Sequence, residues 1–342
     1  MRILYLGENW YGSCARACSY ALRRLGHEVA DIDMQTIYPS LRQLSSRLML
    51  RLFRGQLLDE YNQQVIDLAN SFNPECLLAF KGQYLRSDTL RYLRQRGVKL
   101  YNYFPDRIEL YRGTLIEEAF PEYDCIFETK EYWDGDASGQ IKIRDKVFVP
   151  HGYDADVHRP TALTEFDKVQ YSCDVGYIAT YTLRKELIIS ELIEKYPNVD
   201  LKIWGSGWKK SCRDKRLIKY VRENDLRGMS YAKAIQATKI NLGIMGILPN
   251  IVDETSTRTY EIPACMGFLL HERTNEVLNL YEEGCEIACF DTTDELIENI
   301  RRYLSDDDRR LQIARAGFNR CVPAYSYDNR MAEIIKYHLA HN

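Results

Sequence analysis

Residues 2–33, RILYLGENWYGSCARACSYALRRLGHEVADID, contain the pattern that sets the fold. The apolar run at 2–6 predicts a buried strand, and a loop that contains glycine follows it. Helical periodicity then predicts a helix near 13–25, and a second apolar run predicts a strand at 28–33. Strands that alternate with helices in this way form a parallel sheet with helices on both faces.

The same alternation continues to about residue 150 and then restarts. The other strands predicted in the first half are 76–80, 99–104, 124–128 and 146–149, with helices near 41–70 and 87–96. The second half has predicted strands at 173–178, 200–204, 239–244, 267–270 and 286–290, and helices near 183–195, 230–237, 256–265, 274–282, 293–303 and 306–317. The pattern therefore predicts an α/β protein with two successive Rossmann-like, doubly wound parallel sheets.

A segment with two prolines and a glycine, VPHGYDADVHRP at 149–160, joins the two halves. It breaks the periodicity, as linkers do. We therefore expect an N-terminal domain at 1–150, a C-terminal domain at 151–325 and a last helix at 326–342, in a chain long enough for two cores. Ligands of open parallel sheets bind at the carboxyl ends of the strands, so we expect the chemistry in a cleft between two such domains.

The composition excludes several classes of protein. Hydrophobic residues make up 45% and charged residues 28% of the chain, a balance typical of globular proteins. The formal net charge of −3 argues against a nucleic-acid partner. Ten cysteines without a CxxC pair are expected to be reduced thiols, and the N-terminus has no signal-peptide pattern. With no apolar run near 18 residues long, these features favour a cytoplasmic protein.

The most informative segment of the second half is STRTYEIPACMGFLL at 256–270. Ser256 and Thr257 open a predicted helix, whose N-terminal amides can bind an anion. Arg258 adds a positive fork that suits phosphate. Glu261 follows on the same helical face, where its carboxylate can accept two hydrogen bonds from a ribose diol. The alternative is a capped surface helix with an Arg/Glu pair.

A second candidate phosphate site follows the predicted strand at 173–178. Arg184 and Lys185 stand at the start of the next predicted helix. Cations at this end of a helix oppose its dipole, and a bound anion would offset that cost. The alternative is a solvated basic pair.

Polar groups follow three of the predicted strands in the first half. Lys81 follows the strand at 76–80, where it could contact an acceptor or a phosphate. Asp106 follows the strand at 99–104 and could take a proton from an acceptor hydroxyl. The loop after the first strand is not GxGxxG, so a dinucleotide site is not expected, but five of its residues could approach a ligand: Gly7, Asn9, Trp10, Tyr11 and Gly12. His151 in the linker could contact a donor or hydrogen-bond the hinge.

Two other patterns bear on metals and membranes. D-x-D triplets, which hold a divalent metal in other transferases, occur at Asp31/Asp33, Asp134/Asp136 and Asp154/Asp156. They fall in a strand, a loop and the linker, and we expect none of them to bind a metal. Residues 41–58, LRQLSSRLMLRLFRGQLL, place Arg47, Arg51 and Arg54 on one helical face. Such a helix could lie on an anionic membrane, or pack on the core with a solvated Arg face.

Several motifs, in this order and spacing, resemble one family. They are Phe80-Lys81-Gly82, the Asp106 loop, Val149-Pro150-His151-Gly152-Tyr153-Asp154, Cys173-Asp174-Val175-Gly176 followed by Arg184, Ile203-Trp204-Gly205-Ser206-Gly207-Trp208, Lys239-Ile240-Asn241-Leu242, the 256–270 segment, and Tyr325-Ser326-Tyr327-Asp328-Asn329-Arg330-Met331. Over almost its whole length the chain resembles the spore-maturation CgeB-like glycosyltransferases, which are related to the group-1 GT-B enzymes.

The resemblance implies a nucleotide-sugar donor, expected to be a UDP-sugar, in the second domain. It implies Glu261 on the ribose, Arg184 and Lys185 on the diphosphate, and the loop with Ser230 and Tyr231 on the base. Gly205 of the 203–208 motif belongs to the same donor side. GT-B enzymes generally transfer without a bound metal, so no cofactor is expected. The final helix is expected to cross back to the first domain.

The family pattern is not complete in this chain. Related enzymes often carry Glu-x7-Glu, but Asp253 stands eight residues before Glu261. A first-domain His has no counterpart in NYFPD at 102–106. The sequence thus predicts a metal-independent glycosyltransferase with a hydroxyl acceptor on a glycan, a glycolipid or a protein. The alternatives are a nucleotide-sugar epimerase or hydrolase on the same fold, and a non-catalytic sugar-nucleotide or glycan-binding subunit.

Overall fold

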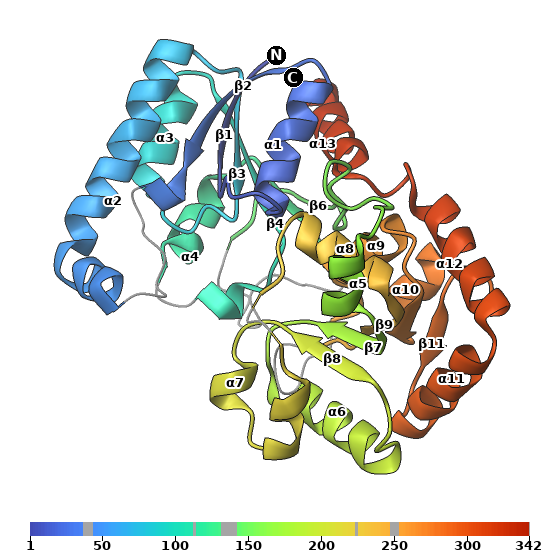
Figure 1. Cartoon of the computed structure of the whole chain (residues 1–342). Coiled ribbons are helices and arrows are strands. Elements are labelled where there is room, and N and C mark those ends of the chain that lie inside the picture. Colours follow the sequence, from blue (N-terminus) through green and yellow to red (C-terminus); the bar gives the residue numbers. More distant parts are fainter. Residues whose placement is uncertain (37–43, 112–113, 131–141, 223–224, 247–252, 342) are drawn as a thin grey trace. The chain divides into compact units, whose positions relative to one another are not determined.

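The computed structural model describes residues 1–36, 44–111, 114–130, 142–222, 225–246 and 253–341, without the side chains of 44–51 and 109. The chain divides into two compact units (Figure 1). One unit comprises Met1–His151 and Tyr327–Asn342, and the other comprises Gly152–Ser326.

The N-terminal unit is built on a parallel sheet, which in the described ranges has six strands in the order β2-β1-β3-β4-β5-β6. The strands are β1 (Arg2–Gly7), β2 (Glu28–Asp33), β3 (Cys76–Phe80), β4 (Lys99–Phe104), β5 (Cys125–Glu128) and β6 (Lys146–Phe148). The helices are α1 (Cys14–Arg24), α2 (Leu44–Phe72), α3 (Ser87–Gln95), α4 (Ile116–Ala119) and α13 (Tyr327–Ala340), and 3-10 turns are at Met34–Thr36, Ile108–Tyr111 and Phe120–Glu122.

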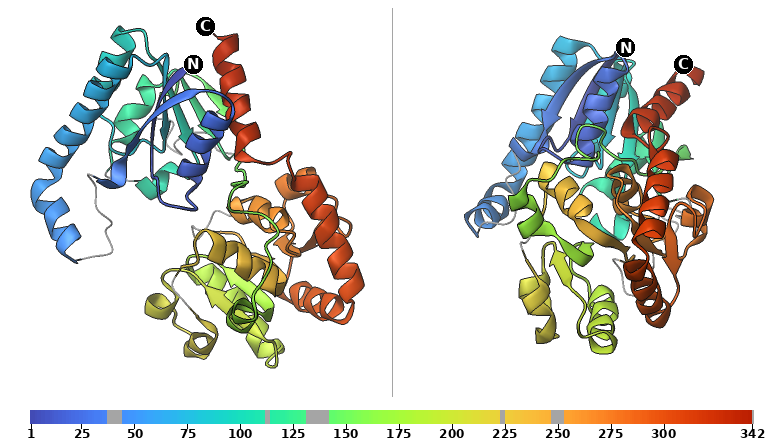
Figure 2. Two further views of the ribbon diagram at one scale, coloured as in Figure 1. Left: turned by 45° about the horizontal axis from the view of Figure 1, so that its top comes forward. Right: turned by 45° about the vertical axis from the view of Figure 1, so that its right-hand side comes forward.

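Alternate residues of these strands face two separate cores, because strand side chains have a period of two. Leu4, Leu6 and Leu77 pack with α2, α3 and α4. Ile3 and Tyr5 pack on the other face with α1 and α13, which lie side by side in both views of Figure 2. The last helix is therefore part of the first unit's core.

The C-terminal unit has a second parallel sheet, with five strands among the described residues, in the order β11-β10-β9-β7-β8. The strands are β7 (Cys173–Ile178), β8 (Leu201–Trp204), β9 (Thr238–Gly243), β10 (Leu269–Glu272) and β11 (Ala288–Phe290). The helices are α5 (Glu165–Tyr171), α6 (Leu183–Lys195), α7 (Trp208–Ser211), α8 (Met229–Ala237), α9 (Thr257–Ala264), α10 (Asn275–Leu280), α11 (Thr293–Ser305) and α12 (Asp307–Cys321), with a 3-10 helix at Lys215–Tyr220.

The predicted α/β fold class is confirmed, and each predicted strand lies within two residues of its expected position. In each sheet the strand order reverses beside the first strand, between β1 and β3 and between β7 and β9. Such switch points leave a crevice outside the carboxyl ends of the two strands, where ligands bind. Site residues are therefore expected at these two edges.

Candidate active site

The carboxyl edge of β7 and β9 in the C-terminal unit gathers the predicted phosphate-binding cations. Helix α6 starts just after β7, and Thr182 caps it by accepting a hydrogen bond from the Lys185 amide at 3.4 Å. Helix α9 lies between β9 and β10 in the chain and places Arg258 in its first turn. Two helix N-termini and their cations thus belong to neighbouring strands of one sheet.

Arg184 is held at the ends of β9 and β10. Its guanidinium donates to the Met245 carbonyl at 2.7 Å and to Glu272 Oε2 at 3.0 Å, and its second nitrogen pairs with Glu272 Oε1. A Cβ on Gly246 would lie 3.0 Å from Arg184 Cδ, so a glycine leaves room for this side chain. Glu272 ends β10 and was not predicted as a site residue. Its carboxylate neutralises part of the cationic cluster.

Lys185 is the most deeply buried cation of the cluster, with only 4% of its surface exposed. Its ammonium donates to the Thr180 carbonyl at 3.2 Å. Burial, the positive charge of Arg258 and that of Arg184 lower the pKa of Lys185 to about 7, although Asp253 and Glu272 act in the opposite direction. The ammonium form of Lys185 is therefore destabilised in this cluster, and a bound anion would favour it.

A buried polar atom at the start of α9, Arg258 Nε, has no hydrogen-bond partner within the described residues. Ser256 forms a capping box with Thr259. The Ser256 amide donates to Thr259 Oγ1 at 3.1 Å, and Thr257 is the first residue of the helix. Leaving buried donors and acceptors unpaired costs free energy, so such atoms are expected to have a partner in the working protein. An anion at this helix start would supply one.

Glu261 lies one turn further along α9, and both of its oxygens face other side chains. Tyr231 donates its hydroxyl hydrogen to Glu261 Oε2 at 2.6 Å. His158 Nε2 lies 3.8 Å from Glu261 Oε1. Ser230 precedes Tyr231 in α8 and its amide donates to the Arg227 carbonyl at 3.2 Å. The structure thus brings together Tyr231 and Glu261, two predicted residues, and adds His158, which was not predicted.

Gly205, the predicted donor-side glycine after β8, is required by the packing of the C-terminal unit. Its φ is +136°, and a Cβ there would lie 2.0 Å from the Ala179 carbonyl oxygen. The same oxygen accepts a hydrogen bond from Trp208 Nε1 at 2.8 Å. The loops after β7 and β8 therefore approach each other too closely for a side chain at position 205.

We expect Gly205→Ala to lower the free energy of unfolding by about 2–4 kcal/mol, because it adds both a clash and an unfavourable φ. Gly284→Ala is the matched control, since its φ is +78° and nothing lies within 4 Å of the added Cβ. The control should cost only about 1 kcal/mol. Urea unfolding of both variants measures the difference, and equal losses would show that the Ala179 contact is unimportant.

In the N-terminal unit, Lys81 and Asp106 form an ion pair at the carboxyl ends of β3 and β4. Their Nζ and Oδ2 atoms are 3.0 Å apart, and Tyr111 donates its hydroxyl hydrogen to the same Asp106 oxygen. Burial raises the pKa of Asp106, but the Lys81 charge and the Tyr111 hydrogen bond lower it more, so the net shift is downward. Burial lowers the pKa of Lys81, but the Asp106 charge raises it by more, so the net shift of the Lys81 pKa is upward. Asp106 therefore remains a carboxylate at neutral pH.

The backbone at Lys81 is shaped to present this side chain. Lys81 has a φ of +69°, which is rare for a residue with a Cβ, and Asn102 Nδ2 donates to its carbonyl at 3.0 Å. Gly82 follows, where an added Cβ would lie 2.6 Å from the Tyr123 hydroxyl. Backbone strain held in place by neighbouring groups is common at functional sites.

His151 is buried near this ion pair. Its backbone carbonyl accepts a hydrogen bond from Arg330 Nε at 3.1 Å, and its Nδ1 has no hydrogen-bond partner within the described residues. Burial and the positive charge of Lys130 lower the pKa of His151 to about 3, although Asp106 acts in the opposite direction. The ring is therefore neutral at physiological pH.

The predicted loop after β1 is tied to its own helix. Trp10 Nε1 donates to Glu8 Oε2 at 2.8 Å, and Ser13 donates its hydroxyl hydrogen to the Glu8 carbonyl at 2.9 Å. A Cβ on Gly7 would lie 2.9 Å from Ala15 Cβ, which explains the first glycine by packing. The other predicted loop residues are Asn9 and Tyr11, which are exposed, and Gly12, which has a φ of +92°.

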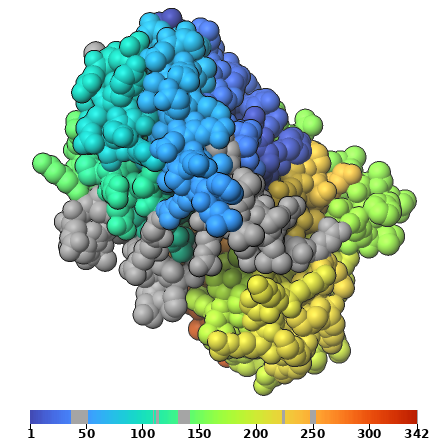
Figure 3. All heavy atoms as spheres, turned by 90° about the vertical axis from the view of Figure 1, so that its left-hand side faces the viewer, coloured from blue at the N-terminus to red at the C-terminus, as the bar shows by residue number. Residues whose placement is uncertain are grey.

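The described residues offer little support for the D-x-D triplets as metal sites or for the basic segment 41–58 as a membrane contact. In the parts of the chain that it describes, no group of three or more His, Cys, Asp or Glu side chains could hold a metal ion. Asp134 and Asp136 lie outside the described residues. No described helix is long and apolar enough to cross a membrane. Of the basic segment 41–58, positions 41–43 and the side chains of 44–51 are not described, while Leu52, Phe53 and Arg54 are exposed on α2, which is light blue in Figure 3.

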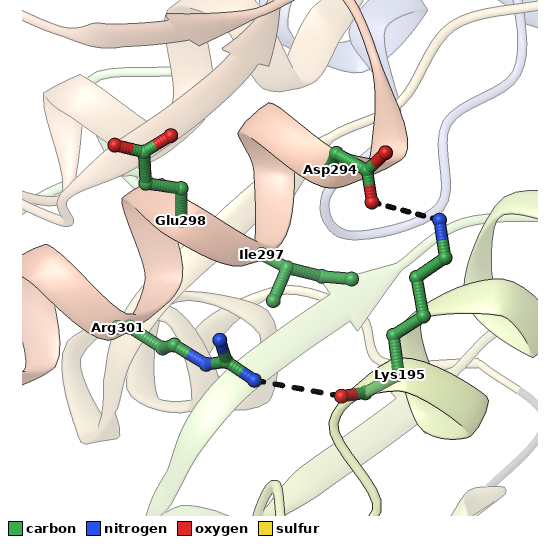
Figure 4. A pocket seen from close by; sticks show the side chains of 5 residues that line it. All are labelled: Lys195, Asp294, Ile297, Glu298 and Arg301. Carbon is green, nitrogen blue, oxygen red and sulfur yellow. Dashed lines mark hydrogen bonds and ion pairs between the residues drawn. The ribbon is translucent and has the colours of Figure 1, made fainter.

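A cavity of about 450 Å³ lies between the C-terminal part of α6 and helix α11 (Figure 4). It is lined by Lys195, Asp294, Ile297, Glu298 and Arg301. Lys195 pairs with Asp294 at 2.7 Å, and Arg301 donates to the Lys195 carbonyl at 3.5 Å. At 1.5 Å per residue, Lys195 lies about 16 Å along α6 from Arg184. Two of these charges pair with each other, and the cavity lies away from the candidate site.

Comparisons with known proteins bear on the fold and on the class of enzyme. Residues 184–336 match a family model described as glycosyl transferase-like. Sucrose-phosphate synthase from Thermosynechococcus elongatus is similar over 100% of both chains, with 11% identity and a TM-score of 0.68. HepE from Anabaena, solved in complex with UDP and glucose, is similar over 99% of this chain and 100% of its own, with 11% identity and a TM-score of 0.63.

A third similar structure is that of a Listeria monocytogenes protein described as a UDP-N-acetylglucosamine 2-epimerase. It is similar over 100% of this chain and 97% of its own, with 9% identity and a TM-score of 0.56. None of the curated proteins compared with the chain matches it. At these identities the structural likeness shows the fold, which is the predicted GT-B fold of two parallel-sheet α/β domains. The family model bears out the predicted class of enzyme, a glycosyltransferase.

Proposed function

We propose that this chain transfers a sugar from a UDP-sugar to a hydroxyl acceptor, and that it belongs to the CgeB-like subgroup of GT-B enzymes. The observation that carries the proposal is the cationic cluster at the switch point of the C-terminal sheet. Lys185 and Arg258 stand at two helix starts, and Lys185 is buried with a pKa lowered to about 7 by burial and the neighbouring arginine charges. Such a cluster suits a diphosphate, whose negative charges would neutralise the positive charges of these side chains.

The roles proposed for the donor side follow from these positions. Lys185, Arg258 and the α9 amides would bind the diphosphate, with Arg184 held beside them by Glu272. Glu261 would accept from the ribose hydroxyls, and Tyr231 would lie near the base. Cations aimed at the leaving diphosphate stabilise the charge that develops as the sugar departs. We therefore propose that transfer needs no bound metal.

The acceptor is proposed to bind the N-terminal unit, where Asp106 would take the proton of the attacking hydroxyl. Asp106 is ionised, and Lys81 orients it at 3.0 Å. A glycan or glycolipid hydroxyl is the proposed acceptor, with 41–58 as a contact to an anionic membrane surface. A cytoplasmic location is proposed because eight of the ten cysteines are buried thiols. The family model favours transfer over epimerisation, although epimerases share the fold.

We expect UDP to raise the melting temperature of the purified protein in the presence of EDTA. A ligand that binds only the folded state at about 100 times its Kd stabilises that state by about 2.7 kcal/mol. Uridine, which lacks the diphosphate, is the matched ligand and should give a much smaller shift. Thermal unfolding with UDP, UDP-glucose, GDP and dTDP measures the effect. The absence of any shift with UDP, with or without magnesium, would contradict the proposal.

A further inference from the structure

We propose that His158 is a positioning residue that holds Glu261 in the orientation needed to bind a ribose diol; this rests on the donor role proposed for Glu261. His158 lies in the linker sequence and belongs to the C-terminal unit. It is buried, with 5% of its surface exposed, and so is Glu261, with 7%. Two buried polar side chains that face each other must be satisfied by their surroundings.

The backbone of the linker fixes the tautomer of His158. The Asp154 amide donates its hydrogen to His158 Nδ1 at 3.0 Å. A ring nitrogen that accepts a hydrogen bond cannot carry a proton, so in the neutral ring the proton is on Nε2. Nε2 is the atom that lies 3.8 Å from Glu261 Oε1. The linker therefore aims an N–H group at the carboxylate.

Tyr231 holds the carboxylate from the other side. Its hydroxyl donates to Glu261 Oε2 at 2.6 Å, and its ring meets the His158 ring edge to face with centroids 5.4 Å apart. Burial and the nearby Glu261 charge raise the pKa of Tyr231 well above its ordinary value, so its hydroxyl stays protonated and keeps donating. A hydrogen bond to one oxygen and the imidazole that lies 3.8 Å from the other restrict the rotation of the carboxylate about its last bond.

This arrangement leaves acceptor capacity for a ligand. An ionised carboxylate has about four lone-pair sites, of which one is used by Tyr231 and one faces His158. The remaining sites can accept from two vicinal hydroxyls, which 2′-deoxyribose lacks. If the carboxylate were free to rotate, part of the preference for ribose would be lost, because ordering the side chain on binding would reduce the net binding free energy. His158 is thus expected to matter for ribose binding and not for the phosphates.

The test compares the affinity of UDP with that of 2′-deoxy-UDP by isothermal titration. The wild type should bind UDP about tenfold more tightly or better, the scale of one hydrogen bond to a charged group. His158→Phe keeps the ring contact with Tyr231 but has no nitrogen, and its preference should fall to about threefold or less. His158→Gln can place an amide N–H near the Nε2 position and should restore most of the preference. The affinity of 2′-deoxy-UDP should be nearly the same in all three proteins.

The outcomes separate this inference from the function on which it rests. A full preference for UDP in His158→Phe overturns the role of His158 while leaving the donor site in place. Failure of the wild type to bind either nucleotide overturns the proposed function and the inference with it. The imidazole ¹⁵N signals of the unmodified protein give a second measurement, should His158→Phe not fold. Protonated Nε2 with a larger change on adding UDP than 2′-deoxy-UDP supports the inference, and protonated Nδ1 overturns it.

Discussion

Asp106→Asn is expected to lower the rate of UDP release from a UDP-sugar by about 10²- to 10⁴-fold and to leave the Kd for UDP unchanged. The factor is that of a general base in proton transfer. The rate should fall because Asn has the same shape as Asp but cannot take a proton. The Kd should not change because Asp106 belongs to the N-terminal unit, whereas the residues proposed to bind UDP belong to the C-terminal unit. The rate is measured by UDP release, with UDP affinity from titration.

The pH dependence gives a further test of Asp106. Lys81 and Tyr111 hold the pKa of this carboxyl below its usual range, because they stabilise the ionised form more than burial destabilises it. The group is therefore ionised, and able to act as a base, at a lower pH than an ordinary aspartate. The acidic limb of the rate profile should begin below the usual range of an aspartate pKa. A limb near pH 6 would point to another base.

Asp31→Asn is the matched control for Asp106→Asn. Asp31 pairs with Arg23 at 2.6 Å in the same unit, so the control also removes one carboxylate from an ion pair. Its turnover should stay within about twofold of the wild type. A similar loss of rate in both variants would show that Asp106 acts only through the stability of its unit.

The fold could be predicted because buried parallel strands have a simple sequence signature. All five residues of CLLAF at Cys76–Phe80 are buried, and such apolar runs between helices indicate a two-sided sheet. The short helix α5 was missed, although Thr164 and Asp167 form a capping box that could have indicated its start. Helices of two turns bury too few residues to show a clear period.

Parts of the candidate site could be predicted for a related reason. Lys81 and Asp106 follow strands that are close in the chain, and the carboxyl ends of parallel strands lie along one edge. Glu272 and His158 could not be found this way. Glu272 contacts Arg184 only because β9, β10 and α6 are packed next to one another in the fold. His158 lies near Glu261 because of the path of the linker, which the sequence does not specify. A single His or Glu has no spacing signal when its partner is far along the chain.

The affinity for UDP is expected to fall as the pH rises above 7, by up to about tenfold per pH unit, because of Lys185. Burial, Arg258 and Arg184 lower the pKa of Lys185 to about 7 in the protein without ligand. A bound diphosphate favours the ammonium form and so raises this pKa. Between the free and bound pKa values, each molecule of UDP must therefore bind together with one proton.

The direction follows from the charges around this lysine. Arg184 and Arg258 oppose protonation, while Asp253 and Glu272 favour it. Below the free pKa of about 7, Lys185 is already an ammonium and contributes no further pH dependence. Above it the protein loses the proton that the complex needs, and the Kd rises. Phosphate groups have a second pKa near 6, so UDP itself changes little above pH 7.5.

Two substitutions separate Lys185 from other titrating groups. Lys185→Arg stays charged at every pH used, so its affinity between pH 7.5 and 9 should be nearly constant. Lys195→Met is the matched control, since Lys195 lies at the other end of α6 in an ion pair with Asp294 and should keep the wild-type slope. Titration with UDP at four pH values gives the slopes. An equal slope in the wild type and Lys185→Arg would assign the proton to another group, and a level wild-type profile would mean that Lys185 does not contact the diphosphate.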